Sequence, residues 1–140
     1  MARRSATRRT RRADPARKLA VEAARIAEKN NAEHVVVLDL RGISPVADYF
    51  VIATGTSNRQ MRTVADDIQD YGESVDQGVW HVAGLDSDDW VLLDFVDVVV
   101  HVFSPACRRH YALELIWGGA PHVRWRLARR KKATGDGEPE

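Results

Sequence analysis

A chain of 140 residues is the size of one domain, and its 44% hydrophobic and 29% charged residues predict a globular core rather than a fibre or a disordered chain. Its longest apolar stretches have the length of a strand, which excludes a membrane-spanning helix of roughly 20 residues. A single cysteine, Cys107, excludes an internal disulfide, and no apolar leader precedes the predicted fold, so we expect a protein of the reducing cytosol.

The net charge of +1 conceals basic ends and an acidic middle. Residues 1–13 carry six arginines and no acid, and residues 122–140 carry six basic and three acidic groups. Residues 14–121 therefore sum to −8 with the histidines neutral. An acidic body favours a cationic partner, whereas arginine-rich tails favour phosphate, and a ribosome offers both. The alternative interpretation is that the acids only keep the domain soluble and that the tails have no partner.

The first predicted helix follows a basic arm. Residues 1–13 show no apolar periodicity, so we expect a disordered arm, although their lack of acids is also typical of an organelle transit peptide. Asp14 and Pro15 have the order of an N-cap and a first helical residue, and the helix is expected to end near Asn30. Its apolar stripe comprises Leu19, Ala23, Ile26 and Ala27.

Two strands and a second helix come next. Residues 34–39 include a continuous apolar run, which is expected of a strand that is covered on both sides or central in a sheet. Residues 49–53 predict the next strand. Ser57 and Gln60 have the spacing of a capping box, so a helix is expected to start there, and residues 78–82 predict a short third strand.

Residues 90–103 are too long for one typical strand and predict a hairpin. A two-residue turn at Val96 and Asp97 places six apolar side chains on one face, as a core face requires. These are Val91, Leu93, Phe95, Val98, Val100 and Val102. The opposite face pairs Asp94 with Val99, Leu92 with His101 and Trp90 with Phe103. Such a mixed face is either covered by a helix or kept for a partner.

Ser104 and Pro105 start the last predicted helix, which ends at Gly118. Its buried stripe is expected to comprise Cys107, Tyr111, Ala112, Leu115 and Ile116. The order of the elements predicts an α/β (α+β) fold in which a mixed β-sheet packs with helices. We expect one folded domain over residues 14–121 and a disordered tail over residues 122–140.

The turn at residues 54–57 precedes a helix N-terminus, where free amides can hold a phosphate. It lacks the lysine and glycine spacing of a P-loop, so we interpret it as a turn followed by a cap. A nucleotidyltransferase would continue with two metal-binding carboxylates one residue apart on a strand. Asp94 and Asp97 instead fall on opposite faces of a strand or across a turn, which disfavours metal-dependent transfer.

No other pattern predicts a catalytic residue, a metal site or a cofactor. Cys107 and His110 are three residues apart on the last helix, but core packing explains the cysteine better than a nucleophile and base pair does. The five histidines lack metal-ligand spacing. His101 alone remains a candidate, either as a contact residue on the mixed hairpin face or as a structural histidine.

Three segments resemble the Iojap-like ribosomal silencing factors. They are residues 48–57 (DYFVIATGTS), residues 90–101 (WVLLD, then DVVVH) and residues 109–117 (RHYALELIW). The resemblance implies a nucleotidyltransferase-like fold that performs no nucleotidyl transfer. It also implies a homodimer that binds the large ribosomal subunit through ribosomal protein L fourteen, hinders association with the small subunit and represses translation.

Two positions depart from the pattern of that family. Val96 stands where the family usually has glycine, and Ala83 stands where it often has an acid. Because valine disfavours positive φ, we expect the turn at Val96 to take a type I or bulged form. A bulged form would shift the register of the hairpin by one residue.

The residues and the resemblance together predict a steric mechanism without chemistry. The mixed hairpin face is expected to dock on the ribosomal protein, so that the bound domain fills space that the small subunit requires. The expected contacts are Trp90, Leu92, Asp94 and His101, with Trp90 as the anchor. The basic tails would add rRNA contacts. The alternatives are a divergent nucleotidyltransferase and an RNA-binding module in which the tails dominate.

Overall fold

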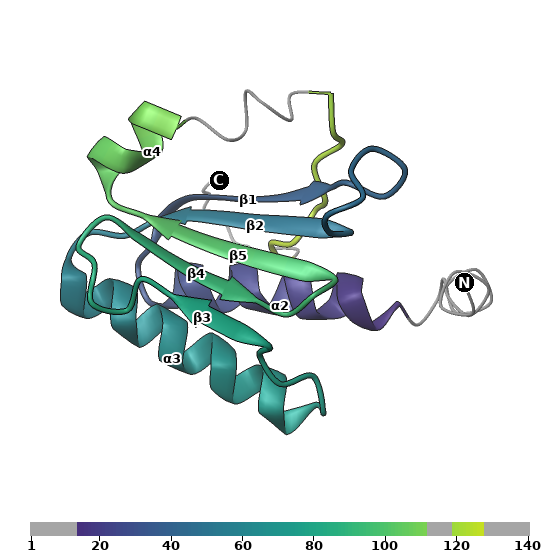
Figure 1. Cartoon of the computed structure of the whole chain (residues 1–140), viewed down its shortest axis with the longest axis horizontal. Helices are drawn as coiled ribbons and strands as arrows, with labels where there is room; N and C mark the ends of the chain where they lie inside the picture. Colours follow the sequence, from purple (N-terminus) through teal and green to yellow (C-terminus); the bar gives the residue numbers. More distant parts are fainter. Residues whose placement is uncertain (1–13, 112–118, 128–140) are drawn as a thin grey trace, which may run out of the picture.

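The computed structural model describes residues 14–111 and 119–127, which form a mixed five-stranded sheet packed with helices (Figure 1). The elements are α2 (Pro15–Lys29), β1 (Glu33–Asp39), β2 (Tyr49–Thr54), α3 (Asn58–Ser74), β3 (His81–Ala83), β4 (Trp90–Asp94), β5 (Val98–Phe103) and α4 (Pro105–Tyr111). The predicted α+β fold with a mixed sheet is confirmed, whereas the nucleotidyltransferase likeness stays a prediction. The expected arm at residues 1–13, most of the last helix's stripe and residues 128–140 lie outside the described residues.

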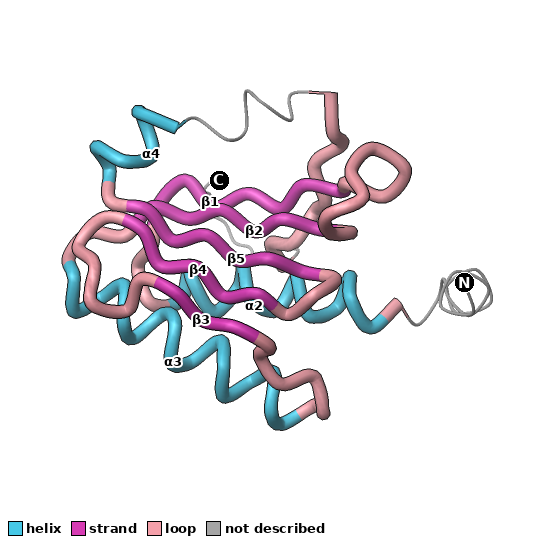
Figure 2. The backbone as a smooth tube through the Cα atoms, viewed as in Figure 1, coloured by secondary structure: helices cyan, strands magenta, loops and turns pink. Residues whose placement is uncertain are grey.

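The strand order is β1-β2-β5-β4-β3, in which β2 and β5 run parallel and the other neighbours run antiparallel. Figures 1 and 2 show α2 and α3 lying on the same face of this sheet. The main core fills the space between these helices and the sheet. Its members include Leu19, Ala23, Val51, Met61, Val64, Ile68, Leu93, Val100 and Val102. The opposite face of the sheet therefore carries neither of the two long helices.

Side-chain caps begin both long helices, as the sequence predicts. The Asp14 carboxylate accepts a hydrogen bond from the Arg17 amide at 3.1 Å, and Pro15 occupies the first helical position. The Ser57 hydroxyl accepts one from the Gln60 amide at 3.1 Å. The Gln60 side chain reaches one residue further back than in a capping box, because its Oε1 accepts from the Thr56 amide at 3.0 Å.

The hairpin of β4 and β5 has the predicted register. Leu92 lies opposite His101, and Trp90 lies opposite Phe103. The six apolar residues of the predicted core face are all buried in the main core. Period-two alternation fixes this register, since a slip of one residue would move every one of those side chains to the other face.

The turn of this hairpin contradicts the type I or bulged form expected at Val96. Val96 has φ +77°, and the Asp97 amide donates to the Phe95 carbonyl at 3.0 Å, which closes a γ-turn around Val96. The Asp94 carboxylate accepts from the Val96 amide at 2.7 Å and helps to hold the turn. The preserved hairpin register therefore forces a β-branched residue into the left-handed region, which costs about 1–2 kcal/mol.

We expect Val96→Gly to raise the free energy of unfolding by about 1 kcal/mol, because glycine adopts positive φ without the clash of a Cβ. Val96 is 56% exposed, so the substitution removes little packing. Urea unfolding measures the change. The matched control is Val46→Gly, since Val46 is 66% exposed and has no positive φ. That control should lose stability through the more flexible unfolded chain. Equal effects of the two substitutions would show that the turn is unstrained.

The edge strand β1 is covered by a segment that we expected to be a tail. The Val123 amide donates to the Val37 carbonyl at 2.8 Å, and the Asp39 amide donates to the Pro121 carbonyl at 2.8 Å. Val123 and Trp125 are 6% and 7% exposed and belong to the main core. The predicted end of the folded body at residue 121 is therefore wrong, because residues 122–126 seal the open edge of β1. The apolar run of β1 is therefore explained by the residues that cover this edge strand, and not by a central position in the sheet.

Candidate functional site

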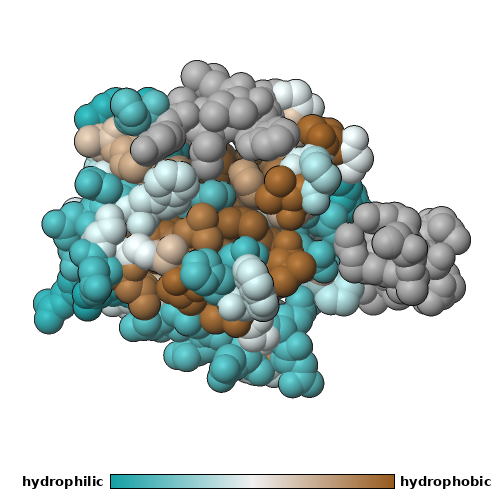
Figure 3. Space-filling model, viewed as in Figure 1, coloured by the Kyte–Doolittle hydropathy of each residue, from teal (hydrophilic) through white to brown (hydrophobic). Residues whose placement is uncertain are grey.

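The sheet face opposite α2 and α3, hereafter the outer face, carries a second apolar cluster. Its buried members include Leu38, Phe50, Ile52, Val99 and Phe103, and its half-buried members include Val36, Trp90 and Leu92. Figure 3 views the molecule from the same side as Figure 1 and shows hydrophobic residues gathered over the middle of the sheet. The half-buried members expose part of this cluster, and apolar surface that gathers in this way is typical of an interaction site.

The four predicted contact residues all lie on this face. Trp90, Leu92 and Asp94 alternate along β4, and His101 lies opposite Leu92 on β5. Trp90, Leu92 and His101 form one group. Asp94 lies at the turn end of the hairpin, where its carboxylate is bonded to the Val96 amide. The carboxylate therefore has a structural role in the turn beside any contact with a partner.

The Trp90 side chain is held by its neighbours on β5. Its indole Nε1 donates to His101 Nδ1 at 3.2 Å, and its ring centroid lies 5.0 Å from that of Phe103. The residue is nevertheless half-buried, so part of its surface stays accessible. A large aromatic side chain that is already fixed loses little conformational freedom on binding, which suits an anchor.

His101 is more buried than a simple contact residue. It is 5% exposed, and aromatic rings surround it, with centroids at 4.6 Å for Phe50 and 5.8 Å for Phe103. Burial lowers the pKa of His101 from 6.5 to about 4, so the imidazole is neutral at pH 7. Its Nε2 is buried and has no hydrogen-bond partner among residues 14–111 and 119–127. The structural role is confirmed, since His101 accepts a hydrogen bond from Trp90, whereas the contact role stays a prediction.

Sequence reasoning missed Phe50 as a member of this face. The residue comes from β2, whose parallel pairing with β5 places it opposite Val99 and beside His101. All six residues of β2 are buried, so the strand shows no alternation from which its outer side chains could be recognised.

Acidic residues are concentrated in one half of the molecule. Residues 58–97, which include α3, β3 and β4, contain ten acidic and two basic residues and account for the whole −8 of the body. Three of these acids, Asp86, Asp88 and Asp89, lie in the exposed loop that leads into Trp90. The anchor residue therefore sits beside negative charge, which favours approach of a cationic partner.

The turn at residues 54–57 is not an open phosphate cradle. The Gly55 amide donates to the Phe103 carbonyl at 2.7 Å, and the Thr56 amide donates to Gln60. The Thr54 hydroxyl accepts from Arg108 Nη1 at 2.8 Å. Its interpretation as a turn with a cap is confirmed.

Residues 14–111 and 119–127 also bring together no group of three or more potential metal-binding side chains. Cys107 packs against the outer-face cluster, and burial together with the charge of Asp89 raises the pKa of its thiol. A raised pKa disfavours a nucleophilic thiolate. Among the helices described, none is long and apolar enough to cross a membrane.

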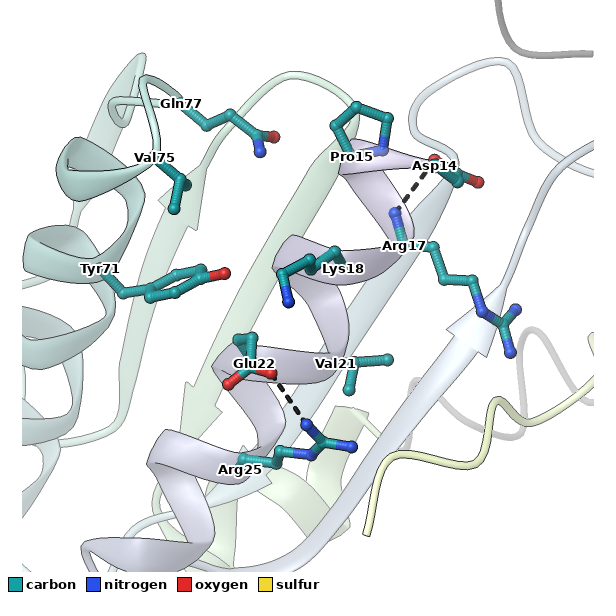
Figure 4. A pocket seen from close by; sticks show the side chains of 10 residues that line it. All are labelled: Asp14, Pro15, Arg17, Lys18, Val21, Glu22, Arg25, Tyr71, Val75 and Gln77. Carbon is teal, nitrogen blue, oxygen red and sulfur yellow. Dashed lines mark hydrogen bonds and ion pairs between the residues drawn. The ribbon is translucent and has the colours of Figure 1, made fainter. Parts of the chain in front are cut away.

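A groove between α2 and α3 lies away from the outer face (Figure 4). It contains none of the predicted contact residues. Arg25, which lines this groove, forms an ion pair with Glu22 at 2.8 Å and donates a hydrogen bond to the Trp125 carbonyl at 2.7 Å. Tyr71 faces α2 across the groove, and burial together with Glu22 raises its pKa. Charges of both signs line this groove, so it selects no ligand class as clearly as the outer face does.

Comparison with known proteins identifies the family. Residues 13–140 match the family described as "Ribosomal silencing factor during starvation". The chain belongs to the ribosomal silencing factors. A ribosomal silencing factor of Bacillus subtilis is 43% identical over 99 residues, which are 71% of this chain and 84% of that protein. The chloroplastic protein Iojap of Zea mays is 37% identical and covers 74% of this chain and 45% of its own length.

The fold agrees with this assignment. A crystal structure of a protein from Chromobacterium violaceum superposes with a TM-score of 0.66 at 33% identity, covering 81% of this chain and 92% of that one. The predicted family is therefore confirmed. The bacterial relatives of this silencing factor are named for a regulatory role and not for an enzymatic reaction, which supports the prediction of a protein that is not an enzyme.

Proposed function

We propose that this silencing factor binds the large ribosomal subunit through ribosomal protein L fourteen and blocks joining of the small subunit by its bulk, which represses translation. The observation that carries the proposal is the outer face, an apolar patch around Trp90 that neither long helix covers. Ribosomal proteins are generally cationic, so the acids beside Trp90 favour their approach. The protein acts in the cytoplasm, associated with ribosomes, and forms a homodimer.

Trp90 and Leu92 make the apolar contacts in this proposal. Both are half-buried before binding, so a partner can remove their remaining surface from water. Asp94 contributes negative charge at the turn end of the hairpin, and His101 holds the indole of Trp90 through its Nδ1. No step requires a cofactor, a metal ion or a covalent reaction.

Sedimentation with separated ribosomal subunits tests the target, and a subunit-joining assay tests the mechanism. The protein should pellet with large subunits and not with small ones. A saturating excess should then lower the yield of joined ribosomes. Binding to large subunits without any effect on joining would contradict the steric mechanism while leaving the target intact.

The basic arm provides a separate prediction about rRNA. If the arginines of residues 1–13 neutralise rRNA phosphates, deleting the arm should flatten the dependence of log affinity on log salt by about 0.7–0.9 for each phosphate that the arm neutralises. Affinity measured from about 50 to 200 mM salt gives the slope. A full-length variant with all six arginines changed to lysine is the matched control, since it keeps the charge and the slope. An unchanged slope after deletion would assign binding to the folded body alone.

A further inference from the structure

On the outer face, the described residues leave a buried hydrogen-bond donor of His101 unused. Trp90 Nε1 donates to His101 Nδ1 at 3.2 Å, so Nδ1 serves as an acceptor. A neutral imidazole with an accepting Nδ1 carries its proton on Nε2. This Nε2 is buried and finds no hydrogen-bond partner in the part of the chain that the structure describes. The face thus holds a desolvated N–H group in the middle of an apolar surface.

The described rings around His101 offer this group no acceptor. The ring lies among Phe50, Trp90 and Phe103, with centroid distances of 4.6, 5.9 and 5.8 Å. None of these side chains has an oxygen that could accept the hydrogen bond. A buried donor without an acceptor costs free energy, and such groups in native proteins call for an explanation. A purely structural role needs only the Nδ1 acceptor and leaves Nε2 unexplained.

We propose that the Nε2–H of His101 is the polar recognition element of the outer face, and that it donates to an uncharged acceptor oxygen, such as a main-chain carbonyl, of the docked protein. This inference rests on the proposed function. It adds a directional requirement to an otherwise apolar contact. A carboxylate is a poor acceptor here because the loop before Trp90 carries Asp86, Asp88 and Asp89.

The burial of the neighbouring rings indicates which side chain a partner can contact. Phe50 is 7% exposed and Phe103 is fully buried, whereas Trp90 is half-buried. Trp90 is therefore the ring of this group that a docking partner contacts directly, beside the imidazole that holds it. A partner that presents only apolar groups would contact the indole and leave the donor unpaired. A partner with a carbonyl at this point would contact the indole and also accept from the Nε2–H. The donor would therefore discriminate between partner surfaces of similar hydrophobicity.

Two substitutions at His101 separate recognition from structure. His101→Gln keeps an amide donor and an acceptor, whereas His101→Met keeps the bulk but removes both. Large-subunit binding by the methionine variant should weaken about tenfold, and the glutamine variant should stay within about threefold of the wild type. The methionine variant should be at least as resistant to urea as the wild type, since it no longer buries an unpaired donor.

Equal binding by all three proteins would overturn the inference, and so would equal loss of binding and stability in both variants. Wild-type protein that fails to sediment with large subunits would instead overturn the proposed function. A measurement on the unaltered protein keeps the test independent of variant folding. With ¹⁵N-labelled histidine, the Nε2–H resonance of His101 should move downfield and exchange more slowly when purified ribosomal protein L fourteen is added. An unchanged resonance in the complex would also overturn the inference.

Discussion

Trp90→Ala should weaken binding to the large ribosomal subunit by about 2 kcal/mol or more, which is roughly 30-fold. Trp90 is the half-buried member of an aromatic group in which Phe103 and His101 hold its indole in place, so truncation removes contact area that is already ordered. It also uncovers His101 Nδ1 to solvent. Affinity is measured by sedimentation with purified large subunits at fixed salt, and the fold is checked by urea unfolding.

The chain supplies a matched control for this experiment. Trp80 is 73% exposed and precedes the edge strand β3, away from the outer-face cluster. Trp80→Ala removes the same kind of side chain and should leave large-subunit binding within about twofold, as is usual outside the centre of an interface. The assignment of the outer face is wrong if folded Trp90→Ala protein binds like the wild type, or if the two alanine variants lose affinity equally.

Local patterns in the sequence determined much of the fold. The register of β4 and β5 could be predicted because only a turn at Val96 and Asp97 gathers six apolar side chains on one face. The starts of α2 and α3 could be predicted because Asp14 and Ser57 stand where an oxygen must satisfy free amides. Each of these features is decided within a few residues of the chain.

Features that depend on distant segments were not predictable. Residues 122–126 have no periodicity, and the burial of Trp125 depends on α2 and β1, about 100 residues earlier in the chain. The conformation of Val96 contradicts the prediction because hairpin pairing constrains this residue more strongly than the intrinsic φ preference of valine does. Two hydrogen bonds at the turn and the paired strands outweigh the preference of one valine.

The candidate site shows the same division. Alternation placed Trp90, Leu92, Asp94 and His101 on one face, and the structure agrees. The burial of His101 could not be predicted, because it requires Phe50, which arrives only through the parallel pairing of β2 with β5. The alternation of residues predicts the face. Tertiary packing buries His101, which supports Trp90 there.

The burial of His101 also predicts a loss of stability in mild acid. The unfolded chain takes up a proton at this residue near pH 6.5, whereas burial holds the pKa of His101 in the folded protein at about 4. Between these values the unfolded state binds more protons, so acid favours unfolding. The free energy of unfolding is highest above pH 6.5 and falls by about 3 kcal/mol as the pH approaches 4. Urea unfolding at several pH values between about 7 and 4.5 measures this slope.

His101→Gln should remove most of that slope, because glutamine does not titrate. His81→Gln is the matched control, since His81 is exposed on β3 and its replacement should leave the slope unchanged. Asp39 does not interfere in this range: although burial opposes it, hydrogen bonds from Arg41 keep the pKa of that carboxyl below 3.8. A slope that persists in His101→Gln would mean that another group carries the acid sensitivity. A loss of the slope would show that the outer face holds a neutral imidazole, the state in which its Nε2–H can serve a partner.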